Sequence, residues 1–134
     1  MGETVIIAGL GFRNDISEAE LERALAAALN GLHIDASRLK AIAIPAAKGE
    51  QAIAAIAAVA AARGVSVRRI EQTQLEAADT RSVTRSARAM QTFNVQCVAE
   101  AAALAGAGAE ARLLSARMIV GPVTCALAEE DLRQ

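Results

Sequence analysis

One stretch fixes the architecture: residues 4–25 read TVIIAGLGFRNDISEAELERAL, a short apolar run that passes through two glycines into a helix start. Val5–Ala8 is continuously apolar and rich in β-branched residues, which is typical of a strand covered on both faces. We therefore expect a central strand here. Ser17 and Glu20 form a Ser-x-x-Glu capping box and predict that a helix begins beside them.

The rest of the chain repeats this alternation of strand and helix. Further strands are expected at Ala41–Ile44 and Val65–Ile70, and further helices at Glu50–Arg63 and Glu71–Ala78. Strands that alternate with helices across short connections indicate parallel crossovers. The second half is less regular, and we expect in it one helix and a strand pair that can be antiparallel, at residues 96–105, 111–114 and 123–127. The predicted fold is α/β: a single three-layer α/β/α domain over residues 1–134, with a mixed, mostly parallel sheet of about five strands.

Composition argues against several classes of partner. With 54% hydrophobic residues and no long Pro/Ser linker, 134 residues suffice for one core. A net charge of −1 gives no electrostatic case for nucleic acid or an anionic membrane surface, and an aromatic content of 1% leaves almost nothing for base stacking. The start of the chain has no basic region, and the alanine-rich Gln51–Ala62 is too short to span a bilayer, so we expect a cytoplasmic protein.

The segment GLGFR, from Gly9 to Arg13, allows three interpretations. Gly9 and Gly11 fit the first two glycines of a dinucleotide-binding turn, but Asn14 stands where the third belongs. Taken alone, the pair is more typical of a tight turn with positive φ. Arg13 adds the third interpretation, because it follows a central strand and precedes a helix N-terminus, where open α/β sheets bind ligands and free N–H groups favour anions.

Other cations are predicted to share that edge of the sheet. Lys48 occupies the loop after the second strand, and Arg81, Arg85 and Arg88 follow the third strand and its short helix. These residues form either a cationic rim for a polyanionic ligand or a set of solvated side chains, and for Arg88 we favour solvation. Thr84 and the hydroxyl residues near it either cap a helix or donate to a ligand.

No catalytic constellation emerges from the sequence. His33 is the only histidine and stands at the predicted end of the first helix, away from the loop edge. Cys97 and Cys125, the only cysteines, fall in apolar or helical surroundings and are expected to be core residues rather than nucleophiles. Glu100 is the one carboxylate that the pattern positions, and we expect its role to be structural. Neither a metal nor a cofactor is expected.

Nearly the whole chain resembles the family of CobE and the CbiG C-terminal domain, which belongs to cobalamin biosynthesis. The resemblance is carried by GLGFR, by the loop with Lys48 and Glu50, and by CVAEAAAL at Cys97–Leu104 and VTCALA at Val123–Ala128. It implies a stand-alone domain of the aerobic corrin pathway. The resemblance also implies that this chain corresponds to the C-terminal part of a longer protein of the anaerobic pathway. Hydrolysis of cobalt-precorrin 5A is usually attributed to the other, larger region of that protein, so we expect no turnover by this chain alone.

Three positions depart from the family pattern. Ala46 replaces an aspartate two residues before the loop lysine, and Arg117 stands where a lysine is usual, which keeps the charge but loses the reactive amine. Cys97 replaces the serine of a Ser-Val-Ala-Glu capping box, so that Asn94 becomes an alternative cap. These changes speak against lysine chemistry and leave anion binding intact.

The ligand implied by the resemblance is a precorrin, a flat apolar macrocycle ringed by carboxylates, which suits an aliphatic cleft edged by cations. We expect the chain to bind, carry or hand over such an intermediate. One alternative is a hydrolase or rearrangement enzyme acting on a precorrin, and another is a non-catalytic scaffold for corrin enzymes or a homodimer module. The first candidates at the site are Arg13, Lys48 and Thr84, and Thr124 is a weaker one. The full set of expected ligand-binding residues is Gly9, Gly11, Phe12, Arg13, Lys48, Glu50, Arg81, Thr84, Arg117 and Thr124.

Overall fold

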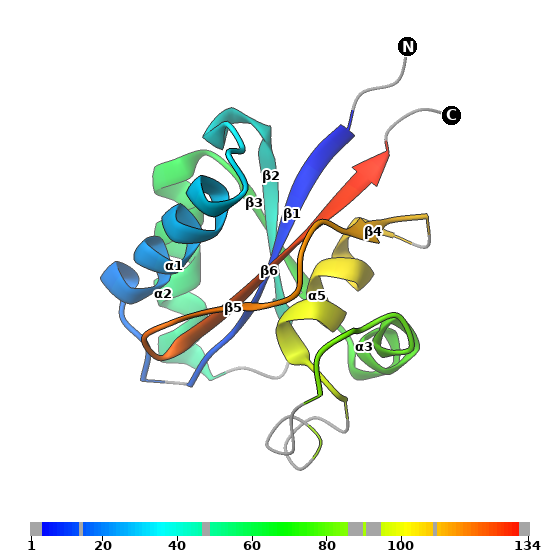
Figure 1. Ribbon diagram of the computed structural model, residues 1–134. Helices are drawn as coiled ribbons and strands as arrows, with labels where there is room; N and C mark the ends of the chain where they lie inside the picture. Colours follow the sequence, from blue (N-terminus) through cyan, green and yellow to red (C-terminus); the bar gives the residue numbers. More distant parts are fainter. Residues whose placement is uncertain are drawn as a thin grey trace.

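The computed structural model describes residues 4–13, 15–46, 49–85, 90, 95–108 and 110–131. Its sheet has six strands in the order β3-β2-β1-β6-β4, with β5 paired to β6 (Figure 1). The strands are β1 (Thr4–Gly11), β2 (Leu39–Pro45), β3 (Ser66–Ile70), β4 (Arg112–Leu113), β5 (Met118–Val120) and β6 (Val123–Asp131). The helices are α1 (Glu18–Gly31), α2 (Glu50–Arg63), α3 (Gln72–Asp79) and α5 (Val98–Ala107), with a short 3-10 helix at Ala36–Arg38. The predicted α/β class with a mixed sheet is confirmed, although the sheet has six strands and not about five.

β1 is the central strand that the apolar run predicts. It pairs in parallel with β2 and antiparallel with β6, and β2 pairs in parallel with β3. Its side chains alternate between two cores: Ile6, Ala8 and Leu10 join the core that contains α1 and α2, while Ile7 joins the core that contains α5. Figure 1 shows α1 and α2 on one side of the sheet and α5 with α3 on the other, which gives three layers.

The capping box at the start of α1 forms as the sequence predicts. The N–H of Glu20 donates to Oγ of Ser17 at 3.2 Å, and the N–H of Ser17 donates to Oε1 of Glu20 at 3.0 Å. α2 has the predicted bounds and ends at Gly64, which takes the left-handed conformation with a φ of 70°. Local sequence signals therefore predict where α1 begins and where α2 ends.

Two elements differ from the sequence prediction. β5 has only three residues, too few to show a period-two pattern, and it was not expected. α5 starts two residues later than expected and continues through Gly106, where the sequence predicted its end. A Cβ on Gly106 would lie 2.8 Å from the Cβ of Ala43 on β2, so this glycine allows the helix to pack closely on the sheet.

Among the helices of the described ranges, none combines the length and the apolar character that crossing a membrane requires.

Candidate functional site

The candidate site lies at the edge of the sheet where the parallel strands β1, β2 and β3 end, which we call the carboxyl edge. Arg13 follows β1 and is exposed, and Glu50 is exposed in the first turn of α2, after the end of β2. Lys48, two positions before Glu50 in the sequence, lies outside the described residues. β6 runs in the opposite direction and so begins at this edge, with Thr124 directly opposite Gly11. The structure therefore brings Gly11, Arg13, Glu50 and Thr124 to one edge, as the topology predicts.

The glycines of GLGFR are packing residues of β1 rather than turn residues. Neither Gly9 nor Gly11 has a positive φ, so the expectation of a positive-φ turn is wrong. A Cβ on Gly9 would overlap the carbonyl oxygen of Ala99 and the main-chain nitrogen of Ala103, because the backbone of α5 lies directly against this residue. Close approach of a helix, and not a change of chain direction, requires glycine here.

Gly11 and Phe12 occupy different environments at the end of β1. A Cβ on Gly11 would lie 2.5 Å from Oγ1 of Thr124, whose hydroxyl donates to the Gly11 carbonyl at 3.4 Å. Phe12 is only 8% exposed and belongs to the core that contains α1 and α2. Of the GLGFR residues, Gly11 and Arg13 therefore reach the carboxyl edge, whereas Gly9 and Phe12 pack inside.

Glu100 is a fully buried carboxylate in the first turn of α5. Its Oε1 accepts hydrogen bonds from the N–H groups of Val83 at 2.8 Å and Thr84 at 3.0 Å. Its Oε2 accepts from the hydroxyl of Thr84 at 2.5 Å and from the N–H of Arg117 at 2.8 Å. Four donors thus replace water around this charge and join α5 to the segment after α3 and to the residue before β5. The expected structural role of Glu100 is confirmed by these contacts.

The hydrogen bonds to Glu100 also decide its protonation state. Burial acts to raise the pKa of Glu100, but the bonds from Thr84, Arg117 and Val83 outweigh burial and hold the pKa below its ordinary value of 4.5. Glu100 is therefore an anion at neutral pH. The hydroxyl of Thr84, which the sequence offered either as a cap or as a ligand donor, is occupied by this carboxylate.

Arg81 lies apart from this group. Its guanidinium donates to the carbonyl oxygens of Ala111 at 3.1 Å and Gly108 at 3.4 Å, beyond the C-terminal end of α5. A cation at that end is favoured by the helix dipole and by the unpaired carbonyl groups there. Arg85 donates to the Ser82 carbonyl at 3.3 Å, and Arg88 lies outside the described residues. Two of the expected ligand-binding residues are therefore used in different places: Arg81 binds carbonyl groups beyond the end of α5, and Thr84 binds Glu100 in its first turn.

Two arginines near the carboxyl edge have guanidinium groups without a partner in the described part of the chain, a property that they share with Arg23 on α1. The guanidinium groups of Arg13 and Arg117 make no hydrogen bond or ion pair there, with Arg13 exposed and Arg117 half-buried. Four arginines elsewhere in the fold, Arg38, Arg63, Arg68 and Arg112, are paired with carboxylates. Arg69, Arg81 and Arg85 donate to main-chain carbonyl groups. The register of the sheet relates the positions of these two arginines. Ile119, two residues after Arg117, is opposite Thr124, and Thr124 is opposite Gly11, two residues before Arg13.

Side-chain carboxylates of this protein lie at two of the helix starts near this edge. At α1 the capping box supplies Ser17 and Glu20. At α5 the carboxylate of Asp79 accepts hydrogen bonds from the N–H groups of Gln96 at 2.7 Å and Cys97 at 3.3 Å. Asn94, the expected alternative cap, lies outside the described residues. Each of these two helix starts thus already has a carboxylate of the chain beside it, which reduces its attraction for an external anion.

The nucleophile candidates are buried or remote, as predicted. Cys97 and Cys125 are each 1% exposed, and burial raises the pKa of both thiols, that of Cys125 to about 12. His33 is exposed just after α1 with a φ of 56°, and its N–H donates to the Asn30 carbonyl at 3.1 Å. In the part of the chain that the structure describes, no group of three His, Cys, Asp or Glu residues is placed to hold a metal ion.

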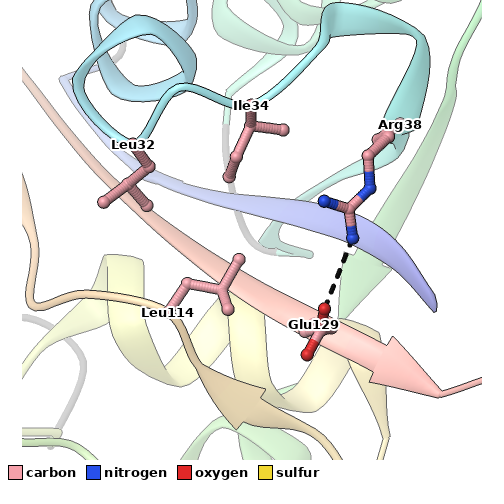
Figure 2. Close-up of a pocket in the computed structure, with 5 residues that line it drawn as sticks. All are labelled: Leu32, Ile34, Arg38, Leu114 and Glu129. Carbon is pink, nitrogen blue, oxygen red and sulfur yellow. Dashed lines mark hydrogen bonds and ion pairs between the residues drawn. The ribbon is translucent and has the colours of Figure 1, made fainter.

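An open hollow of about 220 Å³ lies away from the carboxyl edge, between the connection that follows α1 and the strand β6 (Figure 2). It is lined by Leu32, Ile34, Arg38, Leu114 and Glu129. Its two charged residues pair with each other at 3.3 Å, and the carboxylate of Glu129 also binds Arg112 at 2.9 Å. None of the residues expected from the sequence lines this hollow.

Comparison with known proteins gives consistent results. A family model described as cobalamin synthesis G C-terminus matches residues 6–128. The structure of CobE, a protein from the cobalamin (vitamin B12) biosynthetic pathway, has a TM-score of 0.85 at 28% sequence identity, over 97% of this chain and 94% of that chain. The cobalamin biosynthesis protein chiG from Agrobacterium tumefaciens has a TM-score of 0.67 at 31% identity, over 92% of this chain and 97% of that chain.

A cobalamin biosynthesis protein G homolog from Sulfolobus solfataricus shares the fold, with a TM-score of 0.67 at 18% identity. Its match covers 93% of this chain and 36% of the homolog. No curated protein sequence matches the chain significantly.

Proposed function

Because this chain belongs to the cobalamin synthesis G C-terminus family, and is thus a protein of cobalamin biosynthesis, we propose that it binds a precorrin-type tetrapyrrole at its carboxyl edge. It would carry the intermediate or hand it over to an enzyme of corrin biosynthesis.

The observation that carries this proposal is that two guanidinium groups near one edge, those of Arg13 and Arg117, have no partner among the residues that the structure describes. An arginine without a carboxylate partner is a ready donor to the carboxylate of a ligand, with two parallel N–H groups for its two oxygens. A macrocycle ringed by carboxylates offers several such acceptors. Thr124 and Glu50, at the start of α2, belong to the same edge and are further members of the proposed site. Lys48 remains a candidate from the sequence and lies outside the described residues.

The burial and hydrogen bonding of the potentially reactive side chains favour transport of the ligand over catalysis. The Glu100 carboxylate is fully buried and accepts four hydrogen bonds, so it is not poised as a general base for a bound molecule. The two thiols are buried with raised pKa values, and His33 follows the C-terminal end of α1. Each group is therefore better suited to structure than to turnover.

An absorbance titration tests this proposal. The purified protein is titrated into hydrogenobyrinic acid and available precorrin derivatives, and the spectrum is then followed for several hours. We expect a saturable shift of the tetrapyrrole bands without conversion. Conversion that disappears in Lys48→Ala or Glu50→Gln would make the chain an enzyme instead, and the absence of any shift would favour the scaffold alternative. Lys40→Ala is the matched control, because Lys40 is exposed near the start of β2, at the opposite edge of the sheet.

A further inference from the structure

We infer that Val83, Met90 and Ile119 form an apolar surface that contacts the face of the bound macrocycle; this inference rests on the proposed function. Within the described residues, these three are the large hydrophobic side chains that remain exposed, at 64%, 38% and 64%. None of them belongs to the set of ligand-binding residues expected from the sequence.

Val83 and Met90 both lie beside the start of α5. The N–H of Val83 donates to the carboxylate of Glu100, in the first turn of that helix. Nε2 of Gln96 lies 3.1 Å from Sδ of Met90, and Gln96 directly precedes the N-cap residue of the helix. Two exposed apolar residues of the connection between α3 and α5 therefore lie next to the start of α5.

Ile119 reaches the same region from the sheet. It stands directly opposite Thr124 in the β5–β6 ladder, and Thr124 stands opposite Gly11 in the β1–β6 ladder. Opposite residues of a ladder point to the same face, and the Cβ direction of Gly11 leads to Val98 of α5 at 3.8 Å. Ile119 therefore lies on the α5 side of the sheet, on a strand beyond β6 that the helix leaves uncovered.

The positive charge of Arg117 indicates which kind of molecule binds this surface. Arg117 lies between the two parts, because its N–H and that of Val83 bind the two oxygens of the same Glu100 carboxylate. Its guanidinium has no partner in the described residues. An apolar surface with an unpaired cation in it fits a molecule that has both an apolar face and carboxylates, as a precorrin does. A second copy of the chain fits less well, since two-fold symmetry would bring two such Arg117-bearing surfaces against each other.

The exposed valine and isoleucine allow a test with little risk to the fold. Val83→Ser and Ile119→Ser remove apolar contact area without changing charge. Burial of such a side chain against the ligand predicts roughly five- to tenfold weaker binding of hydrogenobyrinic acid for each variant. Val65→Ser, at a half-buried position that precedes β3, is the matched control and is expected to leave the dissociation constant unchanged.

Salt dependence separates the apolar contribution from the charged one. Arg117→Gln is expected to weaken binding and to reduce the dependence of affinity on salt concentration, whereas the two serine variants should keep the dependence of the unchanged protein. Sedimentation of all variants without ligand measures self-association under the same conditions.

Three results would overturn the inference. If the unchanged protein binds the probe and both serine variants bind it equally well, the apolar surface is not the contact surface, and the proposed function survives. If the unchanged protein does not bind the probe at all, the proposed function fails together with the inference. If the serine substitutions convert a dimer into monomers while affinity for the probe is unaltered, a second copy covers this surface.

Discussion

The main-chain N–H of Arg117 lies 2.8 Å from Oε2 of Glu100, so that the residue before β5 is fixed to the first turn of α5. The other oxygen of the same carboxylate holds Val83 and Thr84. One buried anion thereby sets the relative position of two connections that are not joined by the hydrogen bonds of the sheet.

Removing this charge should destabilise the fold without removing the helix. In Glu100→Gln, an amide NH₂ replaces one acceptor oxygen and faces donors that then lack a partner. We expect a loss of about 2–4 kcal/mol in the free energy of unfolding, measured by urea denaturation. Glu110→Gln, at an exposed position beyond the end of α5, should change stability by less than about 0.5 kcal/mol. Equal effects in the two variants would contradict the role assigned to Glu100.

Acidification should reduce the difference between Glu100→Gln and the unchanged protein. The pKa of Glu100 in the folded state is lowered, so its ionised form contributes stability that is complete above the ordinary value of 4.5. That contribution is lost as the pH falls through the folded-state pKa. Unfolding curves of both proteins should differ by a constant amount at neutral pH and converge below about pH 4.5. A difference that grows on acidification would show that the folded-state pKa is raised instead.

The two glycines of β1 should respond differently to alanine. In Gly9→Ala the new Cβ meets main-chain atoms of α5, which move only if the helix moves, and we expect a loss of about 3 kcal/mol or more. In Gly11→Ala the nearest atom is the hydroxyl of Thr124, whose side chain has room to rotate at a half-buried position, so the loss should be smaller. Thermal unfolding monitored by circular dichroism measures both. The reverse order would show that α5 does not lie against Gly9.

Arg13→Ala should weaken binding of the ligand and leave the stability of the fold almost unchanged. Arg13 is exposed and has no partner in the described residues, so its removal should change the melting temperature by no more than about 2 °C. Loss of a charge-assisted hydrogen bond to a ligand carboxylate should weaken binding of hydrogenobyrinic acid roughly tenfold or more. Arg23→Ala is the control, because Arg23 is an exposed arginine on α1. A large fall in the melting temperature of Arg13→Ala alone would assign Arg13 a structural role.

Most of the fold could be predicted from local signals. The apolar run of β1, the capping box of α1 and the glycine that ends α2 each act within a few residues, so the sequence around them contains the whole signal. The position of Arg13 at the carboxyl edge then followed from topology alone.

Features that depend on distant segments could not be predicted in the same way. The carboxylate that accepts from the two N–H groups just before α5 is that of Asp79, at the end of another helix, and the partners of Glu100 come from two other connections. Gly9 and Gly106 resemble turn or end signals in the sequence, but their role is to let a helix approach the sheet. The exposure of Val83 and Ile119 depends on where α5 lies, and no period in the sequence contains that information.

Each antiparallel pairing of the sheet involves β6, and its ladder with β1 joins residues that are at least 113 positions apart, the separation of Gly11 and Thr124. While the chain is being synthesised, one edge of the central strand therefore has no partner until the residues of β6 have left the ribosome. Closure of such a long loop is expected to be slow, and an unpaired apolar strand can pair with other chains in the meantime. The yield of correctly folded protein should therefore depend on protection of β1 during synthesis.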